Sequence, residues 1–211
     1  MKEPLIKTAA NGKEKQTSYV MTKVNYRRAI RGGFYGEALL IDYAIIEDRL
    51  KSFLYYSGGM IEKNNPNVEI DNPFFIDAYN LTSDRDKNGK ETGRIVVRDI
   101  SRKIWVITKM LKRIEMSCDE DEYLRRMKKA LGSETEIKDF RGSLNSFEKK
   151  WIPKRNEVIH GLLNKNAEDL YSKYKDICED GMKFADYFDN TIRRFKERAD
   201  IRKFLGLKVE Q

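Results

Sequence analysis

The chain has very little histidine, cysteine and proline. Its 211 residues include one histidine, two cysteines and four prolines. Cys118 and Cys178 are far apart in sequence, and neither belongs to a Cys-x-x-Cys pair. Because a structural zinc site needs about four Cys or His ligands, one chain does not supply a set, and we expect neither a metal nor a cofactor. Thiols without a pairing pattern are typical of a reducing compartment.

Long apolar runs are also missing. No stretch approaches the roughly 18 apolar residues that a membrane-spanning helix needs. Residues 1–7, Met-Lys-Glu-Pro-Leu-Ile-Lys, lack the apolar core of a signal peptide. We therefore expect a cytoplasmic protein with no membrane partner.

Charged residues, in contrast, are plentiful. They make up 36% of the sequence beside 40% hydrophobic residues, which is typical of one folded domain with a charged surface. The formal net charge is +8 and the isoelectric point is about 9.3. A basic surface favours the approach of nucleic acid, although a solvated lysine-rich surface produces the same excess.

The first quarter of the chain predicts two helices. Residues 1–16 are polar and are interpreted as a flexible tail. The helix that follows, capped by Thr17 or Ser18, ends where Gly32 and Gly33 interrupt the helical pattern.

The second helix, over residues 36–56, has apolar residues every three or four positions, which predicts a central core helix. Asp42 and Glu47 lie on this helix. They are interpreted as its polar edge, and the alternative is that they support a nearby functional site from behind.

Turn-forming residues dominate the segment from 57 to 93. Gly, Pro, Asn and Asp recur there in clusters. Because a structureless loop of this length is uncommon in a compact domain, we expect an insertion with a short hairpin or helix of its own. A lid, a dimer arm and a regulatory element are the alternatives for its role.

A strongly amphipathic helix is predicted from about residue 94 to 115. Its isoleucines share one face, and the opposite face is basic and includes a tryptophan. This basic face either tracks RNA phosphates and stacks a base, or is a solvated face whose tryptophan is covered by the insertion or by a partner chain. The candidate RNA-binding residues follow Arg94 on it: Arg98, Arg102, Trp105, Lys109 and Arg113.

The last third predicts further helices. A helix over 119–131 is closed by Gly132, and Ser133 with Glu136 forms a capping box for a helix that runs to about residue 151. Pro153 is interpreted as the break after it and as the first turn of a short helix to about 163.

A long final helix follows, capped by Asn166 and Asp169, with Gly181 at a kink or a close helix crossing. The sequence therefore predicts an all-α antiparallel bundle of about five or six helices. We expect a single domain over 17–205, interrupted by the insertion 57–93 and followed by a tail at 206–211.

The only histidine lies in the stretch 151–163, Trp-Ile-Pro-Lys-Arg-Asn-Glu-Val-Ile-His-Gly-Leu-Leu. Asn156 and His160 are four residues apart and share a helical face, and the long side chain of Arg155 can bend toward the same edge. A helix start at Pro153 would add free amide groups, which favour a phosphate.

These residue types suit RNA cleavage without a metal. A histidine can accept the proton of the 2′-hydroxyl or protonate the leaving 5′-oxygen. An arginine matches the phosphate oxygens with its planar fork, and an asparagine can orient either group. Because one chain holds one histidine, an acid and a base together would require two chains, so a two-fold homodimer is expected.

Arg155-Asn156-x-x-x-His160 resembles the R-x(4–6)-H signature of the HEPN superfamily, in which Asn, Asp or His often follows the arginine. The segment Gly36–Arg49 is similar to the first core helix of that family. The resemblance implies a dimeric helical bundle. It also implies a metal-independent endoribonuclease in a toxin–antitoxin, phage-defence or CRISPR-associated setting, with an antitoxin or regulatory protein as a further partner.

One position departs from the pattern. HEPN toxins paired with a nucleotidyltransferase antitoxin have a tyrosine two residues after the histidine, where this chain has Leu162. This argues against that subfamily. Two alternatives to the enzyme remain. One is a non-catalytic HEPN module that binds RNA or protein. The other is a structural dimerisation bundle in which Arg155 pairs with an acid such as Glu157 or Asp42 and His160 faces the core.

Overall fold

The computed structural model describes residues 12–61, 69–117, 121–161 and 167–209. Leu162 and Asn166 lie outside these ranges. Within them the chain is mostly helical, which confirms the all-α prediction. The elements in chain order are α1 (Gly12–Arg31), α2 (Tyr35–Tyr56), β1 (Glu69–Ile70), α3 (Pro73–Ala78), β2 (Ile95–Val96), α4 (Ile100–Met116), α5 (Glu122–Leu131), α6 (Glu134–Ser146), the π-helix η1 (Phe147–Trp151), α7 (Ile152–Gly161), α8 (Ala167–Arg198) and α9 (Ile201–Phe204).

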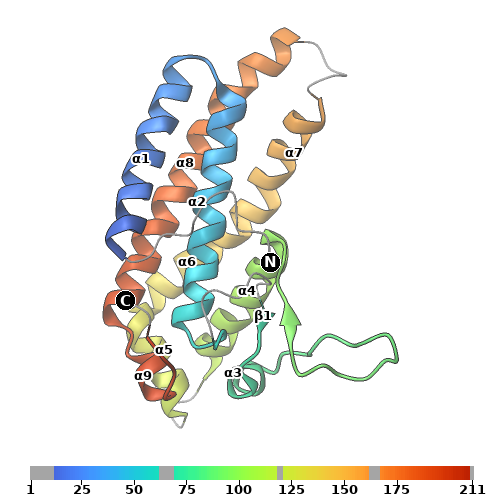
Figure 1. The fold of residues 1–211 in the computed structure, drawn as a ribbon, viewed down its shortest axis with the longest axis vertical. Helices are drawn as coiled ribbons and strands as arrows, with labels where there is room; N and C mark the ends of the chain where they lie inside the picture. The colour runs from blue at the N-terminus through green and yellow to red at the C-terminus, as the bar shows by residue number, and fades with distance from the viewer. Residues whose placement is uncertain (1–11, 62–68, 118–120, 162–166, 210–211) are drawn as a thin grey trace, which may run out of the picture.

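Helices α1, α2 and α8 lie side by side along the length of the molecule (Figure 1). The apolar spacing of α2 buries Leu39, Ile46 and Leu50 completely. Phe53 packs between Phe140 of α6 and Phe195 of α8, with ring centroids 5.5 Å and 4.7 Å away. The described part of the chain has no helix that is both long and apolar enough to cross a membrane.

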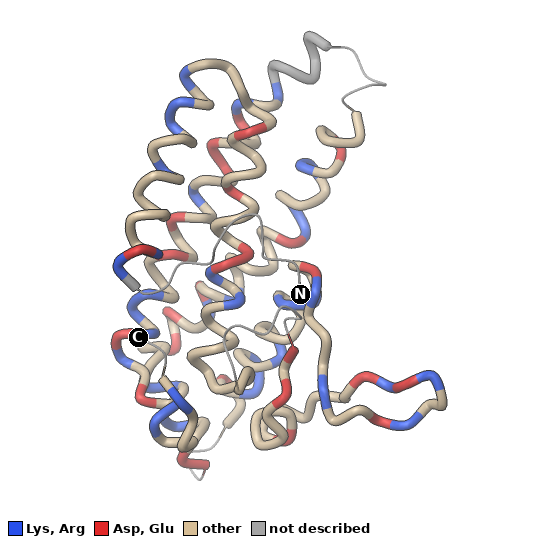
Figure 2. Tube along the Cα trace, viewed as in Figure 1, with Lys and Arg blue, Asp and Glu red and all other residues tan. Residues whose placement is uncertain are grey.

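The insertion has the local order that its composition predicted. Asn72 caps α3 by accepting a hydrogen bond from the amide of Phe74, and Pro73 stands in the first turn. Strands β1 and β2 pair antiparallel. The hairpin before β2 projects from the body of the protein (Figure 1) and carries both charge signs (Figure 2).

Two predicted helix starts were wrong. Helix α1 begins at Gly12, and Thr17 and Ser18 do not cap it, because their hydroxyls donate to carbonyl oxygens one turn earlier inside the helix. Helix α4 begins at Ile100 with Asp99 as its cap. Residues 95–97 were read as helical, but burial alternates there as it does in a strand.

The predicted break at Pro153 was also wrong. Helices α6, η1 and α7 form one continuous helix, in which the amide of Ile152 donates to the carbonyl of Phe147 five residues earlier. This π-turn comes just before the proline, and a π-bulge can accommodate a residue that lacks an amide hydrogen and crowds the preceding turn. The capping box of Ser133 and Glu136 and the Gly132 cap are confirmed.

The segment after α9 is held to the body of the protein and is not a free tail. Arg202 is 3% exposed and donates to the carbonyl oxygens of Met60, Ile61 and Lys208, at 2.7 to 2.8 Å. The Tyr55 hydroxyl also donates to the Lys208 carbonyl, at 3.2 Å. Because several carbonyls share one buried guanidinium, residues up to 208 belong to the folded domain.

Candidate active site

The motif residues lie on α7, which continues from α6 along one side of the bundle (Figure 1). Val158 and Gly161 are buried, whereas Arg155 and Asn156 are half-buried and His160 is exposed. On an α-helix, positions 155 and 160 differ by about 140° and about 7.5 Å. Arg155 and His160 therefore lie on different sides of α7, and Asn156 lies between them and close to the histidine side.

Arg155 has no carboxylate partner among the described residues. Its Nη1 donates to Oδ1 of Asn156 at 3.1 Å. Its guanidinium lies over the ring of Tyr43 on α2, with 4.7 Å between the guanidinium carbon and the ring centroid. Its Nε is buried and has no hydrogen-bond partner in the part of the chain that the structure describes. The side chain is thus fixed by a ring and an amide while its positive charge stays uncompensated, which suits an anionic ligand.

The helix-start phosphate site predicted at Pro153 does not form. Since η1 runs directly into α7, the amide of Ile152 is already bonded within the helix. An N-terminal anion site needs unpaired amides in the first turn. Any phosphate at the motif must therefore be bound by side chains.

Asp42 lies in the core behind the motif helix and not on a polar edge, so that prediction was wrong. It is 0% exposed, and neither carboxyl oxygen has a hydrogen-bond partner among the described side chains and backbone groups. A β-carbon placed on Gly181 of α8 would lie 2.5 Å from Asp42 and 2.8 Å from the Trp151 ring, so a side chain there would clash with both. Burial, and then Asp186, raise the pKa of Asp42 to about 9. The close helix crossing predicted at Gly181 is confirmed.

The indole of Trp151 lies between the buried Asp42 and the surface of the protein, next to Gly181. Its Nε1 donates to the carbonyl of Ile177 on α8 at 2.8 Å, and its ring stacks on Phe147 with centroids 5.0 Å apart. The Tyr26 hydroxyl donates to the next carbonyl, that of Cys178. These bonds tie α1, α8 and the start of α7 together, so they hold the base of the motif helix in place.

Glu47 is only half-buried, and it pairs with Lys103 of α4. The Nζ–Oε1 distance is 2.8 Å, and the lysine side chain is 1% exposed. Burial, and then Glu47, raise the pKa of the Tyr43 hydroxyl, whereas Arg155 opposes the rise. Glu47 and Arg155 thus act on the same tyrosine with opposite sign, but they do not pair with each other.

Three of the predicted RNA-binding residues, Arg102, Trp105 and Lys109, have partners within the chain. Arg102 pairs with Asp84 of the projecting hairpin at 3.2 Å. Trp105 is half-buried between two cations, Arg102 at 4.5 Å and Lys109 at 5.9 Å from its ring centroid. Arg113 is exposed on α4, and Arg98 is exposed but precedes the helix. The structure therefore joins Arg102, Trp105 and Lys109, and within the described residues no hydrogen bond, ion pair or ring contact links them to the motif.

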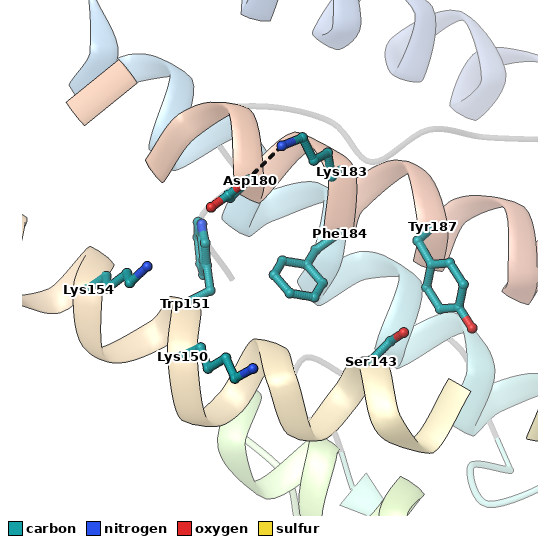
Figure 3. A pocket seen from close by; sticks show the side chains of 8 residues that line it. All are labelled: Ser143, Lys150, Trp151, Lys154, Asp180, Lys183, Phe184 and Tyr187. Atoms are coloured by element: carbon teal, nitrogen blue, oxygen red, sulfur yellow. Dashed lines mark hydrogen bonds and ion pairs between the residues drawn. The ribbon is translucent and has the colours of Figure 1, made fainter. Parts of the chain in front are cut away.

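A groove that the sequence reasoning missed lies between the α6–α7 helix and α8. Its volume is about 390 Å³, and Figure 3 shows the side chains that line it: Ser143, Lys150, Trp151, Lys154, Asp180, Lys183, Phe184 and Tyr187. The available signal was the pair Lys150 and Lys154, four residues apart on either side of Trp151. A helix break at Pro153, as the sequence predicted, would have placed Lys150 and Lys154 on two separate helices.

Within the described ranges, no group of three or more His, Cys, Asp and Glu side chains lies close enough together to hold a metal ion. The chain matches no protein-family model, no characterised protein and no solved structure.

Proposed function

We propose that the chain is a metal-independent endoribonuclease of the HEPN type, which cleaves single-stranded RNA at a site composed from two copies of the chain. The observation that carries this proposal is the state of Arg155. A purely structural arginine at this position would pair with an acid of its own chain, and a structural histidine would face the core. Instead Arg155 has no carboxylate partner among the described residues, and His160 is exposed.

The positions of Arg155 and His160 favour a composite site. The two side chains leave α7 about 140° apart, so one copy does not direct both at a single phosphate. Beside Tyr43, the outer side of α2 exposes Leu40, by 60%, and Ala44. An apolar strip next to an uncompensated guanidinium is suited to cover by a second copy, which would bring its own histidine to the cleft.

In the proposed reaction, one imidazole takes the proton of the 2′-hydroxyl, and the 2′-oxygen attacks the adjacent phosphorus. The bond from phosphorus to the 5′-oxygen breaks, and the imidazole of the second copy gives that oxygen a proton. Arg155 stabilises the negative charge that builds on the phosphate oxygens, and Asn156 keeps the guanidinium in place. The products are a 2′,3′-cyclic phosphate and a 5′-hydroxyl.

The test is cleavage of a labelled single-stranded RNA in excess EDTA. His160→Ala and Arg155→Ala are each expected to lower the rate at least about 100-fold, because each removes a group that acts in the transition state. Lys129→Ala, an exposed cation on α5, is the matched control and should cleave normally. Equal rates for wild type and His160→Ala would contradict the enzyme and favour a non-catalytic RNA-binding module.

The dimer has a test of its own. Leu40→Asp places a charge in the apolar strip without touching the motif, so it should raise the dimer dissociation constant. Specific activity should then fall on dilution and recover at high protein concentration, as followed by sedimentation and cleavage in parallel. The activity of His160→Ala should not recover at any concentration. A monomeric wild type with full activity would contradict the composite site.

A further inference from the structure

The groove between the α6–α7 helix and α8 has two chemically different ends (Figure 3). Lys154 lies at one end, and Lys150, one helical turn before it on the same side of the helix, extends toward Phe184; both lysines are exposed. Ser143 and Tyr187 bring hydroxyl groups to the other end. One end therefore favours a negative charge, and the other favours a neutral polar group.

The charge at the lysine end is not balanced within the described chain. Among the described residues, Asp180 is the only carboxylate that lines the groove, and it accepts a hydrogen bond from Lys183 at 3.0 Å. Neither Lys150 nor Lys154 forms an ion pair with a described residue. Two uncompensated ammonium groups one turn apart suit a phosphate better than a single carboxylate, because a phosphate offers more oxygens and more charge.

The wall between the two ends is aromatic. Phe184 and Tyr187 are half-buried on α8 and face the α6–α7 side of the groove (Figure 3). Phe184 is held by Phe147 and Phe188, with ring centroids 5.4 Å and 6.1 Å away. A ring that the core already fixes offers a stacking surface at little cost in side-chain entropy.

The floor of the groove is built on the π-turn. Trp151 is 2% exposed and ends η1. Its hydrogen bond to Ile177 holds the indole in place, and the ring packs closely on α8 because Gly181 has no side chain. The π-turn also keeps the helix continuous through Pro153, so Lys154 stays in line with Lys150. π-turns are found frequently at functional sites.

We propose that this groove binds a nucleoside phosphate, with the phosphate between Lys150 and Lys154, the base against Phe184 and Tyr187, and the hydroxyls of Ser143 and Tyr187 at the far end. The volume of about 390 Å³ lies in the range of small-molecule sites and is too small for an extended peptide. The ligand is either a free nucleotide or one nucleotide of an RNA strand. This site is on a different side of α7 from His160, and it does not depend on the ribonuclease proposal.

The experiment is calorimetric titration of the full chain with AMP, UMP, adenosine, inorganic phosphate and triuridylate RNA. AMP or UMP should bind at least about tenfold more tightly than adenosine or phosphate alone, since only the nucleotides engage both ends. If inorganic phosphate bound as tightly as the nucleotides, the proposed contact of the base with Phe184 and Tyr187 would be contradicted. Triuridylate binding much more tightly than UMP would identify a strand as the source, and equal binding would identify the free nucleotide.

Two variants test the site itself. Lys150→Gln with Lys154→Gln should weaken nucleotide binding at least about tenfold. The charge-matched control, Lys129→Gln with Lys203→Gln on α5 and α9, should change it less than about twofold. Ser143→Trp fills the groove without changing its charge and should also abolish binding, with thermal unfolding used to confirm that each variant is folded.

Two outcomes would overturn the proposal. One is unchanged nucleotide binding in the double variant Lys150→Gln, Lys154→Gln and in Ser143→Trp. The other is tighter binding of an acidic peptide than of any nucleotide. All titrations are repeated on a His160→Ala background. Nucleotide binding should persist there, so loss of RNA cleavage and loss of the groove site are separate results.

Discussion

Helix α4 and the continuous helix of η1 and α7 both carry rows of basic residues, but the partners of these residues differ. On α4, Lys103 is buried against Glu47 and Arg102 is paired with Asp84. The acids come from α2 and from the projecting hairpin, and they stand 56 and 18 residues away in sequence from the cations with which they pair. Of the row that looked like an RNA surface in the sequence, the fold therefore neutralises Arg102, and Lys103 lies outside that row.

On η1 and α7 the basic side chains have no carboxylate partner among the described residues. Arg155 contacts an amide and a tyrosine ring, and Lys150 and Lys154 form no ion pair with a described residue. A net charge of +8 does not tell which cations are available to a ligand. The availability of a cation depends on the acids that the tertiary structure brings to its helix, because an ion pair already formed must be broken before a phosphate is bound.

The largest expected effect lies on the inner side of Trp151, where a carboxyl group and not a cation is uncompensated. Burial raises the pKa of Asp42 from its ordinary 3.8 to about 9, so Asp42 takes up a proton when the protein folds. Its contribution to stability is complete below about pH 4 and is lost as the pH rises through 9. The loss is at most about 1.4 kcal/mol per pH unit.

Asp42→Asn should remove this dependence. From pH 5 to pH 8 the free energy of unfolding of the variant should increase relative to that of wild type by up to about 4 kcal/mol. Urea unfolding at each pH measures this difference. Asp139→Asn, which changes an exposed carboxylate on α6, should track wild type. A constant difference between Asp42→Asn and wild type across this range would show that Asp42 is ionised in the folded protein.

A smaller effect is expected for the buried cation of α4. Lys103→Met should lower the free energy of unfolding by about 1–3 kcal/mol, because the bonds from its ammonium to Glu47 and to the carbonyl of Arg98 are lost. Glu47 is partly exposed and can regain water, which limits the loss. Lys112→Met, an exposed cation on the same helix, should cost less than about 0.5 kcal/mol. Equal costs would mean that Lys103 is not a structural cation.

The smallest effect concerns RNA binding by the two arginines near the start of α4. Arg98→Gln should reduce the slope of log affinity against log salt by about 1, as expected for one phosphate contact. Arg102→Gln should reduce it by less, because Arg102 is already paired with Asp84. Fluorescence anisotropy at several salt concentrations measures both slopes. A larger reduction for Arg102 would contradict the view that the hairpin neutralises it.

Much of the architecture could be predicted from local patterns. The spacing of Leu39, Ile46 and Leu50 predicted a core helix, and the capping box at Ser133 predicted the start of α6, because both depend on neighbours within one or two turns. Predictions failed where local signals compete. Pro153 was read as a helix break because a proline disrupts a regular α-turn, and a π-turn that removes the conflict has no local signature. Residues 95–97 were read as helical because their apolar side chains extend the helical pattern of α4.

The sequence by itself determined the helical class, the apolar face of each main helix, and the presence of one histidine beside an arginine and an asparagine. These depend on residue type and short-range spacing. Only the tertiary structure decided which charges have a partner of opposite sign. Arg102 and Lys103 pair with acids of other elements, whereas Asp42 and Arg155 have no such partner among the described residues. Burial and ion pairing depend on contacts between residues far apart in the chain, so they follow from how the helices pack.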